Sequence, residues 1–109
     1  MFARVLEMRT KRGQARALCA VVDQKALPVV EKYPGFAQGI CLISEETPDS
    51  VMVISLWQNR EAAEKFRIED YPAVAEMYQP FIDGGIHVRG YDVPFMSAQK
   101  PKAQAAKAS

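Results

Sequence analysis

The chain has 109 residues, of which 49% are hydrophobic, and this length and composition indicate a single domain that can bury a core of its own. The 14 basic and 13 acidic residues give a formal net charge of +1, and the basic excess lies in the last ten residues, so the domain lacks the basic stripe typical of nucleic-acid binding. No apolar run reaches the length of a membrane span, and residues 1–4 do not resemble a signal peptide, so we expect a cytoplasmic protein.

The two cysteines, Cys19 and Cys41, are too few for a disulfide framework. Both lie in apolar surroundings, one in a helical pattern and one in a strand pattern. Because unpaired cysteine is among the most buried residue types, we interpret both as small buried side chains rather than as a redox or metal site.

The first half of the chain predicts a strand, a helix and a second strand. Apolar and polar residues partly alternate over residues 2–9, which is typical of a strand that ends before Gly13. Apolar residues then recur every three or four positions over residues 14–32, which predicts a helix. Pro28 removes a helical hydrogen bond, so we expect a kink at residues 24–27. A breaker follows at 33–35, and a second strand is expected over 36–46.

The second half repeats this order. A polar turn joins the second strand to a third at 51–57, which predicts an antiparallel hairpin. Asn59 is placed to cap a helix. A break is expected at 69–72, because the residue before Pro72 avoids helical geometry. A second helical piece carries an apolar face that includes Ile82, and residues 83–85 end it before a fourth strand at 86–93.

The element order β-α-β-β-α-β predicts an α+β, ferredoxin-like domain with a four-stranded antiparallel sheet over residues 1–94. Residues 95–109 have a low-complexity composition and are expected to form a disordered tail. The helices can cover only one sheet face, yet both faces carry apolar residues. We therefore predict a homodimer that forms through the open sheet face.

Three motifs of this domain resemble the antibiotic biosynthesis monooxygenase-like domains of the dimeric α+β-barrel superfamily. They are Tyr33-Pro34-Gly35-Phe36, the run from Trp57 to Ala63, and the stretch from Pro80-Phe81-Ile82 through Gly84-Gly85 to Tyr91-Asp92-Val93. The resemblance covers residues 2–93. It implies oxygenation of polycyclic phenols with no cofactor and no metal, in an apolar cavity with Asn, Trp and Tyr side chains. Haem-degrading relatives use a His on the second helical layer, but residues 65–77 contain none, which argues against haem breakdown.

The candidate site residues follow from the residue types that this chemistry needs. Candidate catalytic residues are His87, Tyr78 and Asn59, and candidate substrate-binding residues are Trp57, Tyr71, Phe66, Met77 and Phe81. Each also has a structural interpretation: His87 as a strand residue facing the dimer interface or solvent, Asn59 as a helix cap, and Trp57 as a core residue.

Two functions remain open from the sequence. The first is a cofactor-independent monooxygenase acting on a small aromatic or polyketide-like compound. The alternative is a non-catalytic domain that binds a small hydrophobic ligand or only dimerises. A closed interior, filled by the large side chains of the second helical layer, would favour the alternative.

Overall fold

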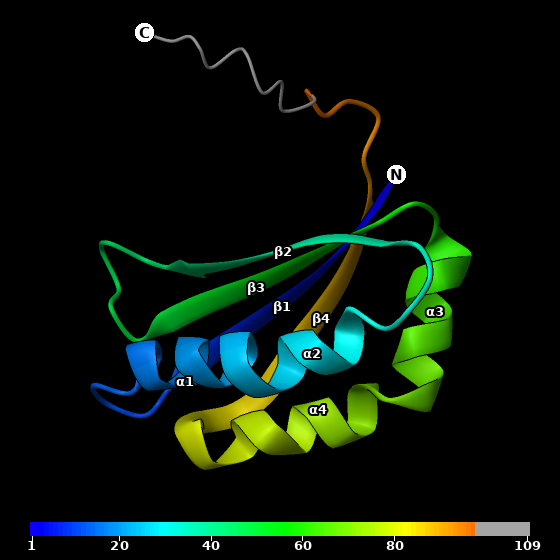
Figure 1. Cartoon of the computed structure of the whole chain (residues 1–109). Coiled ribbons are helices and arrows are strands. Elements are labelled where there is room, and N and C mark those ends of the chain that lie inside the picture. The colour runs from blue at the N-terminus through cyan, green and yellow to red at the C-terminus, as the bar shows by residue number, and fades with distance from the viewer. Residues whose placement is uncertain (98–109) are drawn as a thin grey trace, which may run out of the picture.

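The computed structural model describes residues 1–97 and has the predicted α+β, ferredoxin-like architecture (Figure 1). Its strands are β1 (Phe2–Thr10), β2 (Phe36–Ile43), β3 (Ser50–Trp57) and β4 (Ile82–Asp92). Its helical segments are α1 (Ala15–Val21), η1 (Val22–Ala26), α2 (Leu27–Val30), α3 (Arg60–Glu69), α4 (Tyr71–Tyr78) and η2 (Gln79–Phe81). Of the tail expected at 95–109, residues 98–109 lie outside the described part.

The four strands form one antiparallel sheet in the order β2-β3-β1-β4. The register pairs Leu6 of β1 with Val53 of β3 and with Val88 of β4. Beyond the end of the sheet, the backbone N–H of Val93 donates to the carbonyl of Met1 over 2.9 Å, so β4 returns beside the start of the chain.

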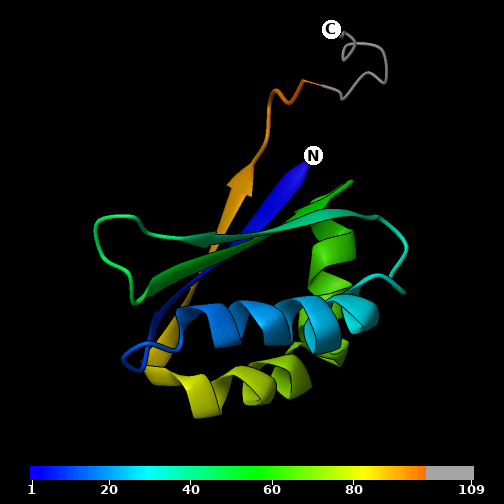
Figure 2. The same ribbon diagram turned by 60° about the vertical axis from the view of Figure 1, so that its left-hand side comes forward.

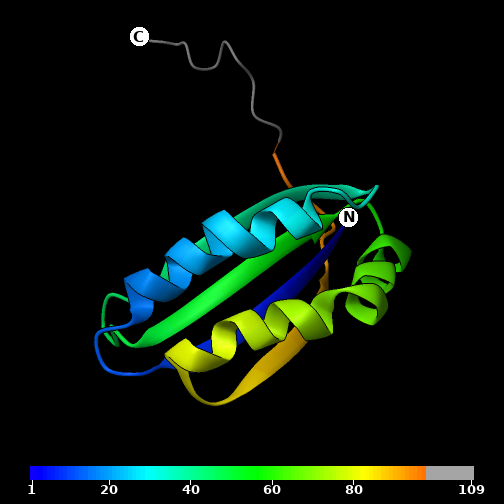
Figure 3. The same cartoon turned by 60° about the horizontal axis from the view of Figure 1, so that its bottom comes forward.

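The helices lie on one face of the sheet only (Figures 1 and 2). The segment from α1 to α2 runs over β2 and β3, whereas α4 runs over β1 and β4 (Figure 3). The main core is packed between these layers and includes Leu6, Leu18, Val51, Val74 and Tyr78. None of the helices within residues 1–97 is long and apolar enough to cross a membrane.

The first helical layer contains a π-helical turn at the place where a kink was expected. In η1 the backbone N–H of Leu27 donates to the carbonyl of Val22, five residues earlier. Pro28 follows directly and has no N–H to offer the carbonyl of Gln24, so the regular α-helical ladder cannot continue there.

The second helical layer divides at Asp70, as the sequence predicted. Asn59 caps α3, because its side chain Oδ1 accepts from the backbone N–H of Ala62 over 2.9 Å. Asp70 is not in helical geometry, and α4 begins at Tyr71 with Pro72 in its first turn, where the missing N–H costs nothing.

One boundary prediction was wrong. Residues 82–85 were assigned to the end of a helix and its breaker, but they belong to β4, which begins at Ile82. Gly84 has a φ of 79°, and the register of β4 against β1 shifts between Glu7 and Arg9. The glycine therefore makes an irregularity inside the strand rather than a stop before it.

The sheet face opposite the helices remains open in the single chain. Cys41 points toward α1, so its neighbours Ile40 and Leu42 point the other way, and they are 37% and 45% exposed. Tyr91 pairs with Ala3 on the same open face and is 48% exposed. An apolar surface of this kind marks a contact site in many proteins.

Candidate functional site

A cavity of about 180 Å³ lies between the helical layer and the sheet. The sheet contributes Leu6, Gly39, Cys41 and Val53 to its lining. The helices contribute residues of α1, η1, α2, α3 and α4, and most of these side chains are apolar. The interior is therefore not completely filled by side chains.

Two tyrosines of α4 line this cavity, Tyr71 from the predicted substrate-binding residues and Tyr78 from the predicted catalytic ones. Tyr71 is half-buried and Tyr78 is only 2% exposed. Burial raises the pKa of Tyr71, and burial together with the neighbouring Tyr71 raises the pKa of Tyr78. Both phenols therefore stay protonated and neutral at physiological pH.

The Tyr78 hydroxyl is available to a ligand. Within residues 1–97, neither Tyr71 nor Tyr78 forms a side-chain hydrogen bond. In the same range every fully buried side-chain N or O atom has a hydrogen-bond partner. The hydroxyl must then reach open space, and the cavity is the space that Tyr78 lines.

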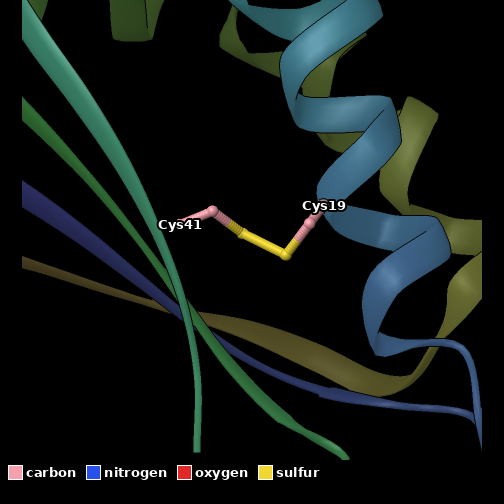
Figure 4. The surroundings of a disulfide bond; sticks show 2 residues. All are labelled: Cys19 and Cys41. Carbon is pink, nitrogen blue, oxygen red and sulfur yellow. A yellow bond between two sulfur atoms is a disulfide. The ribbon is translucent and has the colours of Figure 1, made fainter.

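The two cysteines also line the cavity, and they are joined. Cys19 of α1 and Cys41 of β2 form a disulfide bond, with their Cα atoms 6.3 Å apart (Figure 4). The interpretation of both residues as unpaired buried side chains was therefore wrong. Cys19 on the helix faces Cys41 on the strand, so the two residues share the same apolar surroundings. The sequence does not show this proximity, because 22 residues separate them.

An aromatic cluster adjoins the cavity through Phe66. Phe66 of α3 stacks on Trp57 with ring centroids 5.8 Å apart, and Tyr33 meets Phe66 edge-on at 5.3 Å. The Tyr33 hydroxyl donates to Asp70 over 2.7 Å and to Glu69 over 3.1 Å. Burial and these hydrogen bonds raise the pKa of Tyr33.

Trp57 belongs to this cluster rather than to the cavity wall. Its side chain is 1% exposed, and its indole N–H donates to Ser55 Oγ over 2.9 Å. It fronts a separate hollow of about 20 Å³, which is too small for a ligand. Of the residues expected to bind substrate, Tyr71 and Phe66 line the main cavity, and both also border the small hollow.

Charged residues lie beside that small hollow. Arg4 contacts Glu64 of α3, and Arg67 Nη2 lies 2.9 Å from the same carboxylate. The hydrogen bond from Arg67 is the main reason that the pKa of Glu64 is lowered. Because Glu64 is shared by both guanidinium groups, this cluster is an internal ion-pair network rather than a free anion site.

The structure separates the other predicted residues from the cavity. His87 is the register partner of Glu7 on the open sheet face, so it lies on the side opposite the cavity. Asn59 is exposed and engaged as the α3 cap. Met77 and Phe81 pack against the core without lining the cavity. The structure thus brings Tyr71, Tyr78 and Phe66 together and leaves His87 and Asn59 apart.

Asp23 was missed as a site residue. It lies in η1, is exposed, and is the one carboxylate that lines the cavity in the described part of the chain. Asp23 follows Cys19 by four residues and precedes Ala26 by three, and both of these also line the cavity. The regular helical spacing of three and four residues is therefore the signal that could have located it.

No cluster of three or more His, Cys, Asp or Glu side chains suited to a metal ion occurs among residues 1–97. What the cavity offers is an apolar space, two neutral phenol donors and a carboxylate at its edge. This arrangement can hold a flat apolar molecule and hydrogen-bond an oxygen on it.

Comparisons with known proteins agree with the fold. The family model described as antibiotic biosynthesis monooxygenase matches residues 1–71. A monooxygenase from the gene ActVA-Orf6 of Streptomyces coelicolor, solved in complex with nanaomycin D, is similar with a TM-score of 0.75 at 14% identity, over 91% of this chain and 92% of that chain. No curated protein is similar at a significant level.

Two further solved structures share the architecture. SnoaB, a cofactor-independent oxygenase from Streptomyces nogalater, has a TM-score of 0.71 at 13% identity, over 90% of this chain and 97% of that chain. A protein of unknown function from Nitrosomonas europaea has a TM-score of 0.73 at 14% identity, over 91% and 94%. At such identities the likeness establishes the fold alone.

Proposed function

We propose that this chain, which belongs to the antibiotic biosynthesis monooxygenase family, binds a small aromatic molecule in its cavity and oxygenates it without a cofactor. The observation that carries the proposal is the apolar cavity lined by Tyr78, whose hydroxyl forms no side-chain hydrogen bond within residues 1–97. Nanaomycin D in one solved relative and cofactor-independent oxygenation in another support the ligand class and the reaction type.

The proposed reaction needs no external reductant. A phenol and O2 give a quinone and water, and the substrate supplies the electrons. The phenol first loses its proton, and the resulting anion passes one electron to O2. The two radicals then combine into a peroxide on the ring, and loss of water leaves the quinone. An apolar pocket that excludes bulk water favours this sequence.

The residues of this chain have separate tasks in that reaction. The neutral phenols of Tyr71 and Tyr78 donate hydrogen bonds to the substrate oxygen, which stabilises the anion as charge develops. Asp23, at the cavity lining, accepts the proton directly or through water. Phe66 offers an aromatic surface to the substrate ring.

Oxygen consumption with a one-ring quinol tests the proposal, and two glycines give a matched pair of variants. Gly39 lines the cavity, and a Cβ there would meet its nearest neighbour, Leu27 Cδ1, at 3.7 Å, so Gly39→Val fits locally while it fills the space. Gly85 has open space around it, so Gly85→Val is the control. We expect Gly39→Val to lose binding and oxygen uptake, with Gly85→Val unchanged. No uptake and no binding by the unmodified protein would refute the function.

We also infer that two copies pair through the open sheet face. The support is the exposed apolar surface that includes Ile40, Leu42 and Tyr91. Replacing Leu42 with Lys would put a charge in that contact, so the mass measured by analytical ultracentrifugation should fall from two chains to one. A monomeric unmodified protein at micromolar concentration would contradict the pairing.

A further inference from the structure

The disulfide joins the two sides of the cavity. Cys19 lies on the helical side and Cys41 on the sheet side, and both line the space between them. Figure 4 shows the bond crossing from α1 to β2. The cavity width at this point is therefore set by a covalent link, whereas packing alone sets it elsewhere.

The elements on either side of the bond are the ones best able to move. β2 is an edge strand that pairs only with β3. On the helical side, the π-helical η1 begins three residues after Cys19 and supplies Val22, Asp23 and Ala26 to the cavity lining. A π turn interrupts the regular hydrogen-bond ladder, so this wall is less constrained than a continuous α-helix.

With the disulfide in place, the volume of the cavity suits a ligand of one aromatic ring. An apolar protein cavity of about 150 Å³ takes up benzene, and the volume here is about 180 Å³. A ligand of three fused rings needs substantially more space. The two walls can enclose such a ligand only if one of them moves away from the other.

We propose that the Cys19–Cys41 pair controls the size of ligand that the cavity accepts, with the disulfide form restricted to one-ring ligands and the dithiol form open to multi-ring ligands. The inference rests on the proposed function, because it concerns access to the same cavity. It makes the two cysteines specificity-determining residues whose effect depends on their redox state.

The opening step is a thiol–disulfide exchange. A small dithiol reductant breaks the Cys19–Cys41 bond, becomes a cyclic disulfide itself, and leaves one proton on each of the two sulfurs, so two electrons and two protons are transferred. A disulfide holds its sulfurs about 2 Å apart, whereas thiols in van der Waals contact lie roughly 3.5–4 Å apart. Reduction therefore allows the walls to separate at this point, and both cysteines are half-buried rather than sealed from a small reagent.

The first part of the test measures the bond and the wall without any ligand. Thiol titration of the air-oxidised, unfolded protein should find no free thiol, and the dithiothreitol-treated protein should have two. In hydrogen exchange, the amides of Val22–Ala26 should exchange at least about tenfold faster in the dithiol form. Equal exchange in the two forms, or two free thiols without reductant, overturns the proposal.

The second part compares two probes by calorimetry. Hydroquinone has one ring and anthrone has three. We expect reduction to raise the affinity for anthrone at least about tenfold and to change that for hydroquinone less than about threefold. The double variant Cys19→Ser/Cys41→Ser, without reductant, should behave like the reduced protein. If both redox forms bind anthrone equally, the size control is refuted.

The two proposals fail in different ways. If neither probe binds in any form, the proposed function fails, and the hydrogen-exchange comparison still decides whether the bond restrains η1. If the double variant does not fold, the reduced unmodified protein supplies the same comparison. If hydroquinone binds and anthrone never does, the cavity function stands and the redox control is overturned.

Discussion

The turn at Gly35 offers a sharp test of the packing that holds the aromatic end of the cavity. Gly35 has a φ of 92°, and a Cβ added there would lie 2.7 Å from the Cβ of Ala62 in α3. Its carbonyl also accepts from the backbone N–H of Gln58 over 2.8 Å, so the turn cannot move freely. Gly35→Ala therefore faces a conformational cost and a steric cost at once.

The two costs can be estimated separately. A left-handed conformation costs an alanine about 1–2 kcal/mol. A Cβ contact of 2.7 Å must relax toward the ordinary 3.5–4 Å, and such overpacking costs roughly 1–3 kcal/mol. We expect Gly35→Ala to lower the free energy of unfolding by about 2–5 kcal/mol in urea denaturation monitored by circular dichroism.

Gly13 provides the matched control for the conformational cost. Its φ is 74°, and no atom lies within 4 Å of an added Cβ, so Gly13→Ala should cost only about 1–2 kcal/mol. Adding Ala62→Gly removes the clash at Gly35, so the cost of Gly35→Ala should fall to that of Gly13→Ala in this background. The reasoning is refuted if Gly35→Ala costs no more than Gly13→Ala, or if Ala62→Gly brings no relief.

Three further predictions concern single features. Asn59→Ala should lower the free energy of unfolding by about 1 kcal/mol, because alanine removes the acceptor for the Ala62 N–H, whereas Asn59→Asp keeps an acceptor and should change it little. Equal losses for the two variants in chemical denaturation would contradict the cap. Reducing the Cys19–Cys41 bond should lower the free energy of unfolding by about 3 kcal/mol, because a loop closed over 22 residues loses about this much chain entropy in the unfolded state. The stability of the double serine variant should not change when reductant is added. Burial raises the pKa of Tyr78, so above a pH of about 10 the unfolded chain releases this proton before the folded protein does, and the free energy of unfolding falls. Tyr78→Phe should lose less stability over that range. Parallel curves of stability against pH for the two proteins would refute the assignment.

Local signals in the sequence predicted the fold well. Asn59 and the Asp70–Pro72 break are decided by the chemistry of a few neighbouring residues, and the structure has both as expected. The start of β4 was wrong because the spacing of Phe81 and Ile82 also fits a helical face. Only the tertiary pairing with β1 shows that Gly84 makes an irregularity within a strand.

The site was harder to predict, since it depends on which residues face each other across layers. The sequence grouped His87 with Arg89 and Tyr91 but could not show that the helices cover the other face. Cys19 and Cys41 are brought together by the packing of a helix on an edge strand, which no local pattern contains. Tyr71 and Tyr78 both line the cavity because the apolar face of their helix points toward the sheet.

The hydrogen bond between Val93 and Met1 has a practical consequence for engineering. It brings the two ends of the folded region side by side, while the β2–β3 turn at residues 44–49 is exposed along most of its length. A short peptide joining residue 93 to residue 1 should therefore permit a circularly permuted protein whose new ends lie in that turn. In such a rearranged chain β3 would come first and β2 last, with the register of the sheet preserved.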